Sequence, residues 1–136
     1  MKTIATSRSR GKTIAVWVLQ ILVGASFIAA GSAKLASAPM MVQIFDHIGV
    51  GQWFRYVTGI VEVAGGIMVL IPRSSPVGGA LLAVTMACAI VVHLLRIGGN
   101  PAPAFVLLVL SAAIVWLRRD QLVGLLGQAN SATTST

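Results

Sequence analysis

Residues 56–71 read YVTGIVEVAGGIMVLI, an apolar run that contains one charged side chain, Glu62. Sixteen residues of helix span about 24 Å, which is most of the ~30 Å hydrocarbon core of a bilayer. The run is too long for a strand, and lipid offers the backbone no hydrogen-bond partner, so it predicts a transmembrane helix. Pro72 follows directly and should end the helix, because proline lacks the backbone donor that a further turn requires.

Three further apolar runs of comparable length accompany this one. Together they predict helices over residues 14–34, 55–71, 77–95 and 102–117. We therefore expect an all-α integral membrane protein whose membrane domain, residues 14–118, is an antiparallel four-transmembrane-helix bundle. Residues 1–13 would form a basic cytoplasmic N-terminus, and residues 119–136 a polar cytoplasmic tail that should fray from Gln128 onward.

The composition supports lipid as the solvent. Of 136 residues, 57% are hydrophobic and 10% are charged, whereas a water-soluble domain carries about 25% charged residues. The net charge of +7 comes from cations placed between the apolar runs and not along one basic face, so no nucleic-acid partner is expected. The single cysteine, Cys88, excludes an intrachain disulfide and is interpreted as a small apolar filler.

Lys and Arg residues predict which side of the membrane each connection faces. If the N-terminus is cytoplasmic, seven cations lie on the inner side and three on the outer side: Lys2, Arg8, Arg10, Lys12, Arg73, Arg118 and Arg119 against Lys34, Arg55 and Arg96. This excess places both termini in the cytoplasm. Aromatic residues agree, because Trp17 and Trp116 fall at the inner boundary and Trp53 and Tyr56 at the outer one. The first run exceeds the hydrophobic region of a signal peptide, so we expect it to stay as a helix.

The connection between the first two runs predicts a short amphipathic helix in the outer loop. Pro39 suits a first helical position, and Gly49 suits a stop. Between them, five apolar residues share one face: Met40, Met41, Ile44, Phe45 and Ile48. Such a helix would lie in the outer interface or cover the bundle, and a plain apolar loop packed on the helix ends is the alternative. Asp46 and His47 diverge by about 100° on a helix, so we interpret them as solvated positions and not as a catalytic pair.

Small residues predict where the helices pack, since in lipid they allow two backbones a close approach. Two rows recur every four residues: Ala25, Ala29 and Ala33 on the first helix, and Gly79, Ala83 and Ala87 on the third. On the second helix, Gly59 and Gly66 flank Glu62 on one face. A neighbouring helix should press close there and shield the carboxylate from acyl chains.

Three ionisable side chains should meet in the outer half of the membrane. Lys34 ends the first helix, Glu62 lies roughly 9 Å deep in the second, and His93 is near the outer end of the third. An isolated charge at mid-bilayer costs at least ~2.5 kcal/mol, so Glu62 should be either paired with a cation or protonated. We predict a Lys34–Glu62 ion pair with His93 as a hydrogen-bonding third member. The three are candidates for ligand binding or a proton relay, and a pair that only fixes helix register is the alternative.

Five segments carry a resemblance to a known family. They are Gly31–Leu35 at the end of the first run, Trp53–Tyr56 at the start of the second, Thr58–Gly66 within it, Pro72, and Met86–His93 in the third. In this order the chain resembles the DoxX family, nearest its DoxX-like branch, over residues 14–118. The resemblance implies a four-helix protein of the bacterial inner membrane, and it places Lys34, Glu62 and His93 at polar positions typical of the family. Its name-giving relatives are subunits of thiosulfate:quinone oxidoreductase.

These features predict a non-catalytic membrane subunit whose outer-half polar pocket holds a quinone or a lipid headgroup, or anchors redox partner proteins. Secondary candidates for the pocket are Thr58, Arg55, Arg96 and Met86. The sequence contains no nucleotide, zinc or nucleophile motif, so it predicts no catalytic residue and no metal site and does not support an enzyme acting alone. The resemblance to the DoxX family implies instead a subunit of a quinone-linked oxidoreductase.

Two alternative functions stay open at this stage. One is a small proton-coupled transporter that uses Glu62, and the other is a purely structural accessory subunit of a larger membrane complex. The expected partners are the lipid bilayer, membrane or redox-complex proteins and, in a homo-oligomer, further copies of the chain.

Overall fold

The computed structural model describes residues 2–134, with side chains from residue 10 onward. All regular structure in this part of the chain is helical. The elements in chain order are α1 (Lys2–Leu35), α2 (Pro39–Ile48), α3 (Gln52–Leu70), α4 (Ser75–Val92), a π-helical turn η1 (His93–Ile97), α5 (Ala102–Leu117) and α6 (Arg119–Thr134). The prediction of an all-α protein is confirmed.

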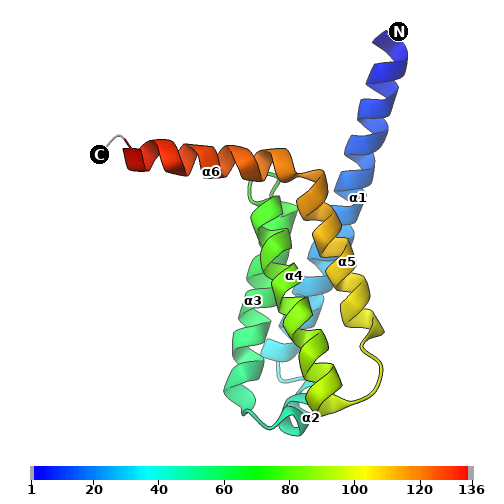
Figure 1. Cartoon of the computed structure of the whole chain (residues 1–136). Helices are drawn as coiled ribbons and strands as arrows, with labels where there is room; N and C mark the ends of the chain where they lie inside the picture. The colour runs from blue at the N-terminus through cyan, green and yellow to red at the C-terminus, as the bar shows by residue number, and fades with distance from the viewer. Residues whose placement is uncertain (1, 135–136) are drawn as a thin grey trace.

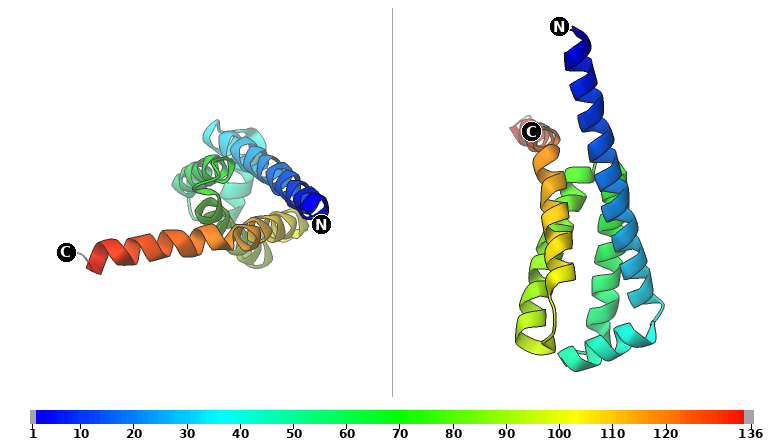
Figure 2. Two further views of the ribbon diagram at one scale, coloured as in Figure 1. Left: turned by 90° about the horizontal axis from the view of Figure 1, so that it is seen from above. Right: turned by 90° about the vertical axis from the view of Figure 1, so that its right-hand side faces the viewer.

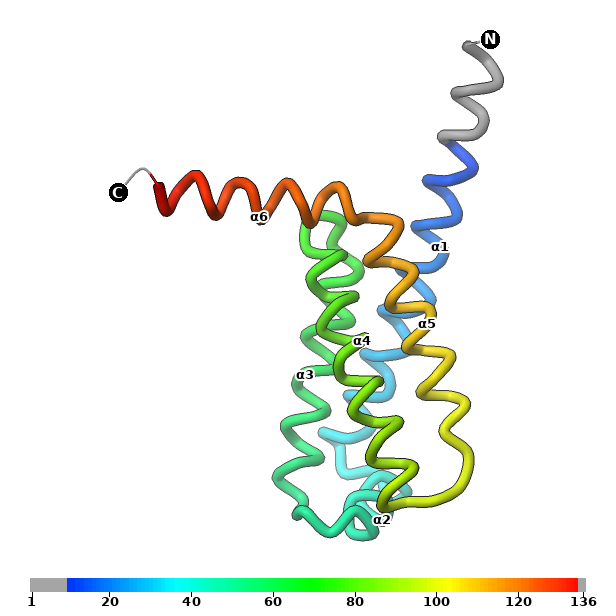
Figure 3. The backbone as a smooth tube through the Cα atoms, in the orientation of Figure 1, coloured from blue at the N-terminus to red at the C-terminus, as the bar shows by residue number. Residues whose placement is uncertain are grey.

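The helices α1, α3, α4 and α5 pack side by side and form a bundle (Figure 1). α2 lies across one end of the bundle, which we call the α2 end. α6 leaves the opposite end, the α6 end, after a bend of 64° from α5, and seen from above it projects sideways past the bundle (Figure 2). The backbone trace passes from α1 through α2 into α3, and then through α4 and α5 to α6 (Figure 3).

The described residues contain three segments that are long and apolar enough to cross a membrane: Arg10–Leu35, Gln52–Leu70 and Ser75–Ile97. α5 contributes to a fourth if it is counted with α6 as one bent span. Large apolar side chains such as Val84, Leu95 and Phe105 are exposed on the outside of the bundle. Soluble proteins rarely expose apolar surface on this scale, so the exterior is that of a helical membrane protein.

The helices extend further at both ends of the chain than the sequence predicts. α1 begins at Lys2 and not at residue 14. α6 continues to Thr134 where fraying from Gln128 was expected, and residues 135 and 136 lie outside the described residues. Neither segment contains a proline, so every residue in it has the backbone N–H that a continuing helix requires.

α2 has the start and stop that its sequence indicates. Pro39 occupies the first turn, and Gly49 takes a left-handed backbone conformation (φ 80°) that ends the helix and that residues with a side chain rarely adopt. Phe45 and Ile48 are buried, whereas Met40 is exposed although it belongs to the predicted apolar face. α2 therefore packs on the bundle with only part of that face.

α1 and α3 meet through two pairs of glycines. A Cβ atom added to Gly66 would lie 2.9 Å from the carbonyl oxygen of Gly24, and one added to Gly59 would lie 3.0 Å from that of Gly31. The two pairs define an antiparallel contact in which the backbones touch. The prediction that the face of α3 around Glu62 accepts a closely packed helix is confirmed.

The predicted packing row on α1 is wrong. Ala25 and Ala29 are exposed, and Ala33 is only half-buried. The reason is steric, since Gly24 and Gly31 lack the methyl group of alanine and let the backbone of α3 come closer. The helix is therefore rotated so that its glycines, and not its alanines, face the partner.

The apolar core is formed by residues from α1, α3, α4 and α5: Val23, Phe27, Val69, Leu82, Met86, Ala104 and Ile114. On α4 the first member of the predicted small-residue row, Gly79, is buried against α5, but Ala87 is exposed. Cys88 is exposed as well, so its interpretation as a filler of the interior is wrong. Its neighbours on α4 present the same face to the outside of the bundle.

Candidate functional site

Lys34 and Glu62 form a salt bridge between the end of α1 and the middle of α3. The Lys34 Nζ atom donates to Glu62 Oε2 over 2.8 Å. The two side chains are 12% and 3% exposed, so both charges are largely removed from solvent. The predicted ion pair is present, and it satisfies the requirement that a buried carboxylate have a cationic partner.

The glycine contact explains why these two side chains meet. A Cβ atom on Gly59 would lie 3.1 Å from the Cβ of Lys34, so the absence of a side chain there lets the last turn of α1 approach α3. Glu62 follows Gly59 by three residues and lies on the same face. The lysine stem therefore needs to reach less than one helical turn to place its ammonium group on the carboxylate.

Arg55 is the second buried cation at the α2 end. Its side chain is 3% exposed, and its Nη1 donates to the carbonyl oxygen of Lys34. Carbonyl groups in the last turn of a helix lack a partner within the helix, so the guanidinium caps α1 and its charge complements the negative end of the helix dipole. Arg55 was expected as an outer-side cation and a secondary candidate, and this cap was not predicted.

A glutamine joins Arg55 to α2. Gln52 accepts a hydrogen bond of 2.6 Å from Arg55 Nε through its Oε1, and its Nε2 donates to Asp46 Oδ1 over 2.6 Å. The same nitrogen lies 3.1 Å from the carbonyl oxygen of Val42. Asp46, expected to be a solvated position, is exposed but anchored to α3 by this bond.

These contacts make one continuous polar chain, which we call the α2-end network. It consists of Asp46, Gln52, Arg55, Lys34 and Glu62. The network connects α2, α3 and α1, and it carries two cations and two carboxylates. Lys34 pairs directly with Glu62, whereas Arg55 reaches Asp46 only through Gln52 and reaches Lys34 only at its backbone carbonyl.

His93 does not join this network. It lies half-buried at the start of η1, and among the described residues its ring makes no hydrogen bond or ion pair, so the predicted hydrogen bond to the Lys34–Glu62 pair is wrong. The register of α3 and α4 gives the reason. Gly65 lies against Leu82, and counting along each helix from that contact puts His93 roughly 12 Å nearer the α2 end than Glu62.

The secondary candidates are scattered. The Thr58 hydroxyl donates to the carbonyl oxygen of Phe54 in its own helix, and Arg96 is exposed on η1. Met86 is 5% exposed and belongs to the apolar core, so it does not line a polar site. Arg55 is the one secondary candidate that contacts a residue of the ion pair, and it does so at the backbone carbonyl of Lys34.

A second buried polar cluster, which was not predicted from the sequence, lies at the α6 end. Gln20 on α1 is fully buried; its Nε2 donates to the carbonyl oxygen of Val69 over 2.8 Å, and its Oε1 accepts hydrogen bonds from Nε and Nη2 of Arg118. The contacts connect α1, α3 and the end of α5. The available signal was an amide side chain within the otherwise apolar run of residues 14–34.

Fold, apolar exterior and buried ion pair together define a helical membrane protein with a polar network at each end of its bundle. The chain belongs to the DoxX-like family, whose model matches residues 18–117. The predicted resemblance is confirmed.

Two proteins of Bacillus subtilis (strain 168) are similar to the chain. One is named "Putative oxidoreductase CatD" and is 28% identical over 78 residues, which are 57% of this chain and 58% of CatD. The other, "Uncharacterized protein YdgD", is 31% identical over 83 residues, 58% of this chain and 73% of YdgD. The match with CatD thus covers less than two thirds of that protein's length. No solved structure matches the chain.

Proposed function

We propose that the chain is a non-catalytic membrane subunit that holds the headgroup of a quinone at the Lys34–Glu62 pair. The observation that carries the proposal is the pair itself, a buried donor and a buried acceptor side by side in a membrane protein. Ionisable groups inside membrane segments are costly, and functional sites are where they are most often retained.

The chemistry of the pair suits both redox states of a quinone. An ammonium group has three donors, and the described residues use one of the Lys34 donors for Glu62, so a quinone carbonyl can accept another. A carboxylate accepts several hydrogen bonds, and Oε1 of Glu62 can receive the hydroxyl of a quinol. Because Lys34 is the more exposed partner, a ligand would reach the pair from its side.

The name of a relative adds independent support for a redox setting. That relative carries the name "Putative oxidoreductase CatD", and its similarity to this chain covers over half of each protein. A subunit that binds quinone without reacting with it would place the acceptor next to a catalytic partner protein.

We further propose a membrane orientation. α1, α3, α4 with η1, and α5 would cross the bacterial inner membrane as four antiparallel spans, with α2 in the outer interface and both termini in the cytoplasm. Exposed aromatic residues support two boundaries, since Trp53 and Tyr56 lie near the α2 end and Trp17 and Trp116 nearer the α6 end. Maleimide labelling of Ser37→Cys in a Cys88→Ala background tests it: an impermeant reagent should label intact spheroplasts, and labelling only after lysis would reverse the orientation.

A fluorescence titration tests quinone binding at the pair. Trp53 lies nine residues before Glu62, which is about 14 Å along α3 and half a turn around it, so it is too far away to report contact at the carboxylate. Thr58 lies about one turn before Glu62 on the same face, so Thr58→Trp in a chain whose own three tryptophans are replaced by phenylalanine places an indole beside the pair. A ubiquinone or menaquinone analogue titrated into this chain in nanodiscs should quench the fluorescence to saturation.

Matched variants separate binding at the pair from partition into lipid. Glu62→Gln keeps the shape of the side chain and removes its charge. It should raise the quinone concentration at half-saturation about tenfold. Arg96→Gln removes an exposed cation and should leave the titration unchanged. Linear quenching without saturation, or equal titrations of the two variants and the parent chain, would refute the proposal.

A further inference from the structure

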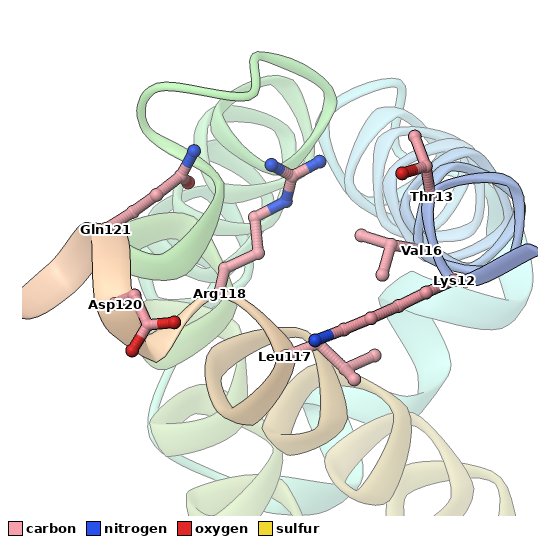
Figure 4. Close-up of a pocket in the computed structure, with 7 residues that line it drawn as sticks. All are labelled: Lys12, Thr13, Val16, Leu117, Arg118, Asp120 and Gln121. Carbon is pink, nitrogen blue, oxygen red and sulfur yellow. The ribbon is translucent and has the colours of Figure 1, made fainter. Parts of the chain in front are cut away.

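A hollow opens at the α6 end between α1 and the junction of α5 with α6 (Figure 4). Its volume is about 230 Å³, which is room for several water molecules at about 30 Å³ each. The residues that line it are Lys12, Thr13, Val16, Leu117, Arg118, Asp120 and Gln121. The hollow lies at the opposite end of the bundle from the Lys34–Glu62 pair and is independent of it.

The floor of this hollow is apolar, and the side chains around it are charged. Val16 and Leu117 supply apolar surface from α1 and α5. The charged side chains come from separate elements, Lys12 from α1, Arg118 from the end of α5 and Asp120 from the first turn of α6 (Figure 4). An apolar floor with charged groups around it matches a molecule that is apolar at one end and ionic at the other.

The Arg118 side chain is held in place from inside the bundle. Its Nε and Nη2 atoms donate to Oε1 of Gln20, which is itself fixed by its bond to Val69. A guanidinium group has five donors in one plane, so donors remain for an oxyanion in the hollow. Little side-chain freedom would be lost when Arg118 binds a ligand, because the buried glutamine has already restricted it.

The signs of the charges around the hollow restrict the class of ligand that can bind there. Lys12 and Asp120 form no ion pair with each other, with Arg118 or with any other described residue. Two cations fit a phosphate group, whereas the carboxylate of Asp120 would repel a purely anionic ligand and attract an ammonium group. A zwitterion that carries phosphate and a primary amine satisfies all three side chains.

The position of the hollow indicates where such a ligand comes from. α5 ends at Leu117, and α6 turns away by 64°, with Val123 and Leu126 exposed along it. Trp116 is exposed in the last turn of α5 and Arg118 and Arg119 follow it, and tryptophan and arginine are residue types that gather at the headgroup layer. The lining side chains are therefore at the depth of phospholipid phosphates.

We infer that this hollow binds the phosphoethanolamine headgroup of a phospholipid. Lys12 and Arg118 contact the phosphate, Asp120 accepts hydrogen bonds from the primary amine, and Val16 and Leu117 contact the glycerol and upper acyl region. The bound lipid would connect α1 to the α5–α6 junction beside the Gln20–Arg118 hydrogen bonds.

Native mass spectrometry of the full chain in detergent tests the inference. Phosphatidylethanolamine and phosphatidylcholine with identical acyl chains are added at equal concentration, and the retained lipid is counted. We expect about fivefold more phosphatidylethanolamine, because the trimethylated amine of phosphatidylcholine has no N–H to donate to Asp120. Asp120→Asn should bring the ratio close to one, and Lys12→Gln should lower the retention of both lipids.

Arg119→Gln is the matched control. Arg119 is exposed next to Asp120, but its guanidinium stacks on the Trp116 ring 4.3 Å away, and it does not line the hollow. Its loss should leave retention and ratio unchanged. Equal retention of the two lipids by the parent chain, or an equal effect of Arg119→Gln and Lys12→Gln, would overturn the inference.

A competition experiment distinguishes the lipid from its soluble headgroup. Free phosphoethanolamine in large excess should fail to displace the lipid, because it lacks the groups that contact Val16 and Leu117. Displacement at millimolar concentration would overturn the lipid assignment and identify a site for a soluble phosphate compound. Lys12 and Asp120 are exposed, so their variants should fold, and an unchanged circular dichroism spectrum verifies this.

Discussion

Lys34 and Glu62 are each unfavourable in lipid when alone, and the salt bridge removes most of that penalty. Burying one unpaired charge costs several kcal/mol, but a matched apolar pair of similar volume can replace a buried ion pair with little loss. The contribution of the pair to stability is therefore a property of both residues together. A structural role in helix register and a role in ligand binding make different predictions for variants of the pair.

A double-mutant cycle measures the structural role. Lys34→Met and Glu62→Leu should each lower the free energy of unfolding by about 3 kcal/mol, because each leaves the other charge buried without a partner. The double variant should recover to within about 1 kcal/mol of the parent chain. Unfolding in mixed micelles, followed by circular dichroism, provides the values, and losses that simply add in the double variant would show that the two side chains do not interact.

Arg55 should not tolerate replacement by lysine. Its guanidinium donates from two different nitrogens to Gln52 and to the Lys34 carbonyl, and the single ammonium nitrogen of lysine, on a flexible four-carbon stem, cannot reproduce that fork. We expect Arg55→Lys to lower the free energy of unfolding by about 2 kcal/mol. Arg96→Lys is the control, since Arg96 is exposed, and a similar loss in both variants would contradict the assigned role.

What the sequence reveals at this scale depends on the kind of contact. The cost of a lone carboxylate in lipid was enough to predict that Glu62 has a cationic partner. Arg55 and Gln20 bind backbone carbonyls, and no complementary residue type in the sequence announces such a partner. The position of His93 depends on helix register, which the sequence leaves undetermined.

At the scale of single helices, the α1–α3 contact depends on the absence of side chains at the glycines of α3. The backbone of α1 occupies the volume where side chains on Gly59 and Gly66 would be. Glycines at these places contribute by allowing contact, although glycine inside a helix is otherwise unfavourable by up to about 1 kcal/mol relative to alanine. A glycine in a helix that no neighbouring element approaches should contribute only this unfavourable helix propensity.

Alanine substitutions separate the two effects. In Gly66→Ala the new Cβ would lie 2.9 Å from the Gly24 carbonyl oxygen, so the helices must move apart, and we expect a loss of about 2 kcal/mol. Gly124 in α6 has no atom within 4 Å of the same position, so Gly124→Ala should leave stability unchanged or raise it slightly. Thermal unfolding in detergent measures both, and equal effects of the two substitutions would refute the packing argument.

The rows of small residues show what a pattern can predict about a helix. The prediction for α3 was correct because a carboxylate between two glycines in lipid must be covered by a closely packed helix. The row on α1 was wrong because alanines every four residues and the glycine pair Gly24 and Gly31 are both compatible with close packing. Only the partner helix decides between them, and the sequence of α1 alone does not contain that information.

At the scale of the whole molecule, polar contacts clamp the bundle at two separate levels. The α2-end network joins α1, α2 and α3, and the Gln20–Arg118 cluster joins α1, α3 and α5. Lys34 and Gln20 are fourteen residues apart on α1, or roughly 21 Å. Between these levels the helices are held by apolar core residues and by glycine contacts.

Because of this separation, we expect the two polar clusters to contribute independently to the free energy of unfolding. We expect the losses of stability in Lys34→Met and Gln20→Met to add within about 0.5 kcal/mol in the double variant, since sites more than 10 Å apart without shared partners behave additively. The Lys34 and Glu62 substitutions should not add, and they serve as the internal control measured under the same conditions. A coupling above about 1 kcal/mol between the two ends would contradict a rigid bundle. It would require α1 and α3 to shift as a unit between two arrangements, which is the motion that a proton-coupled transporter needs and that a rigid headgroup-binding subunit does not.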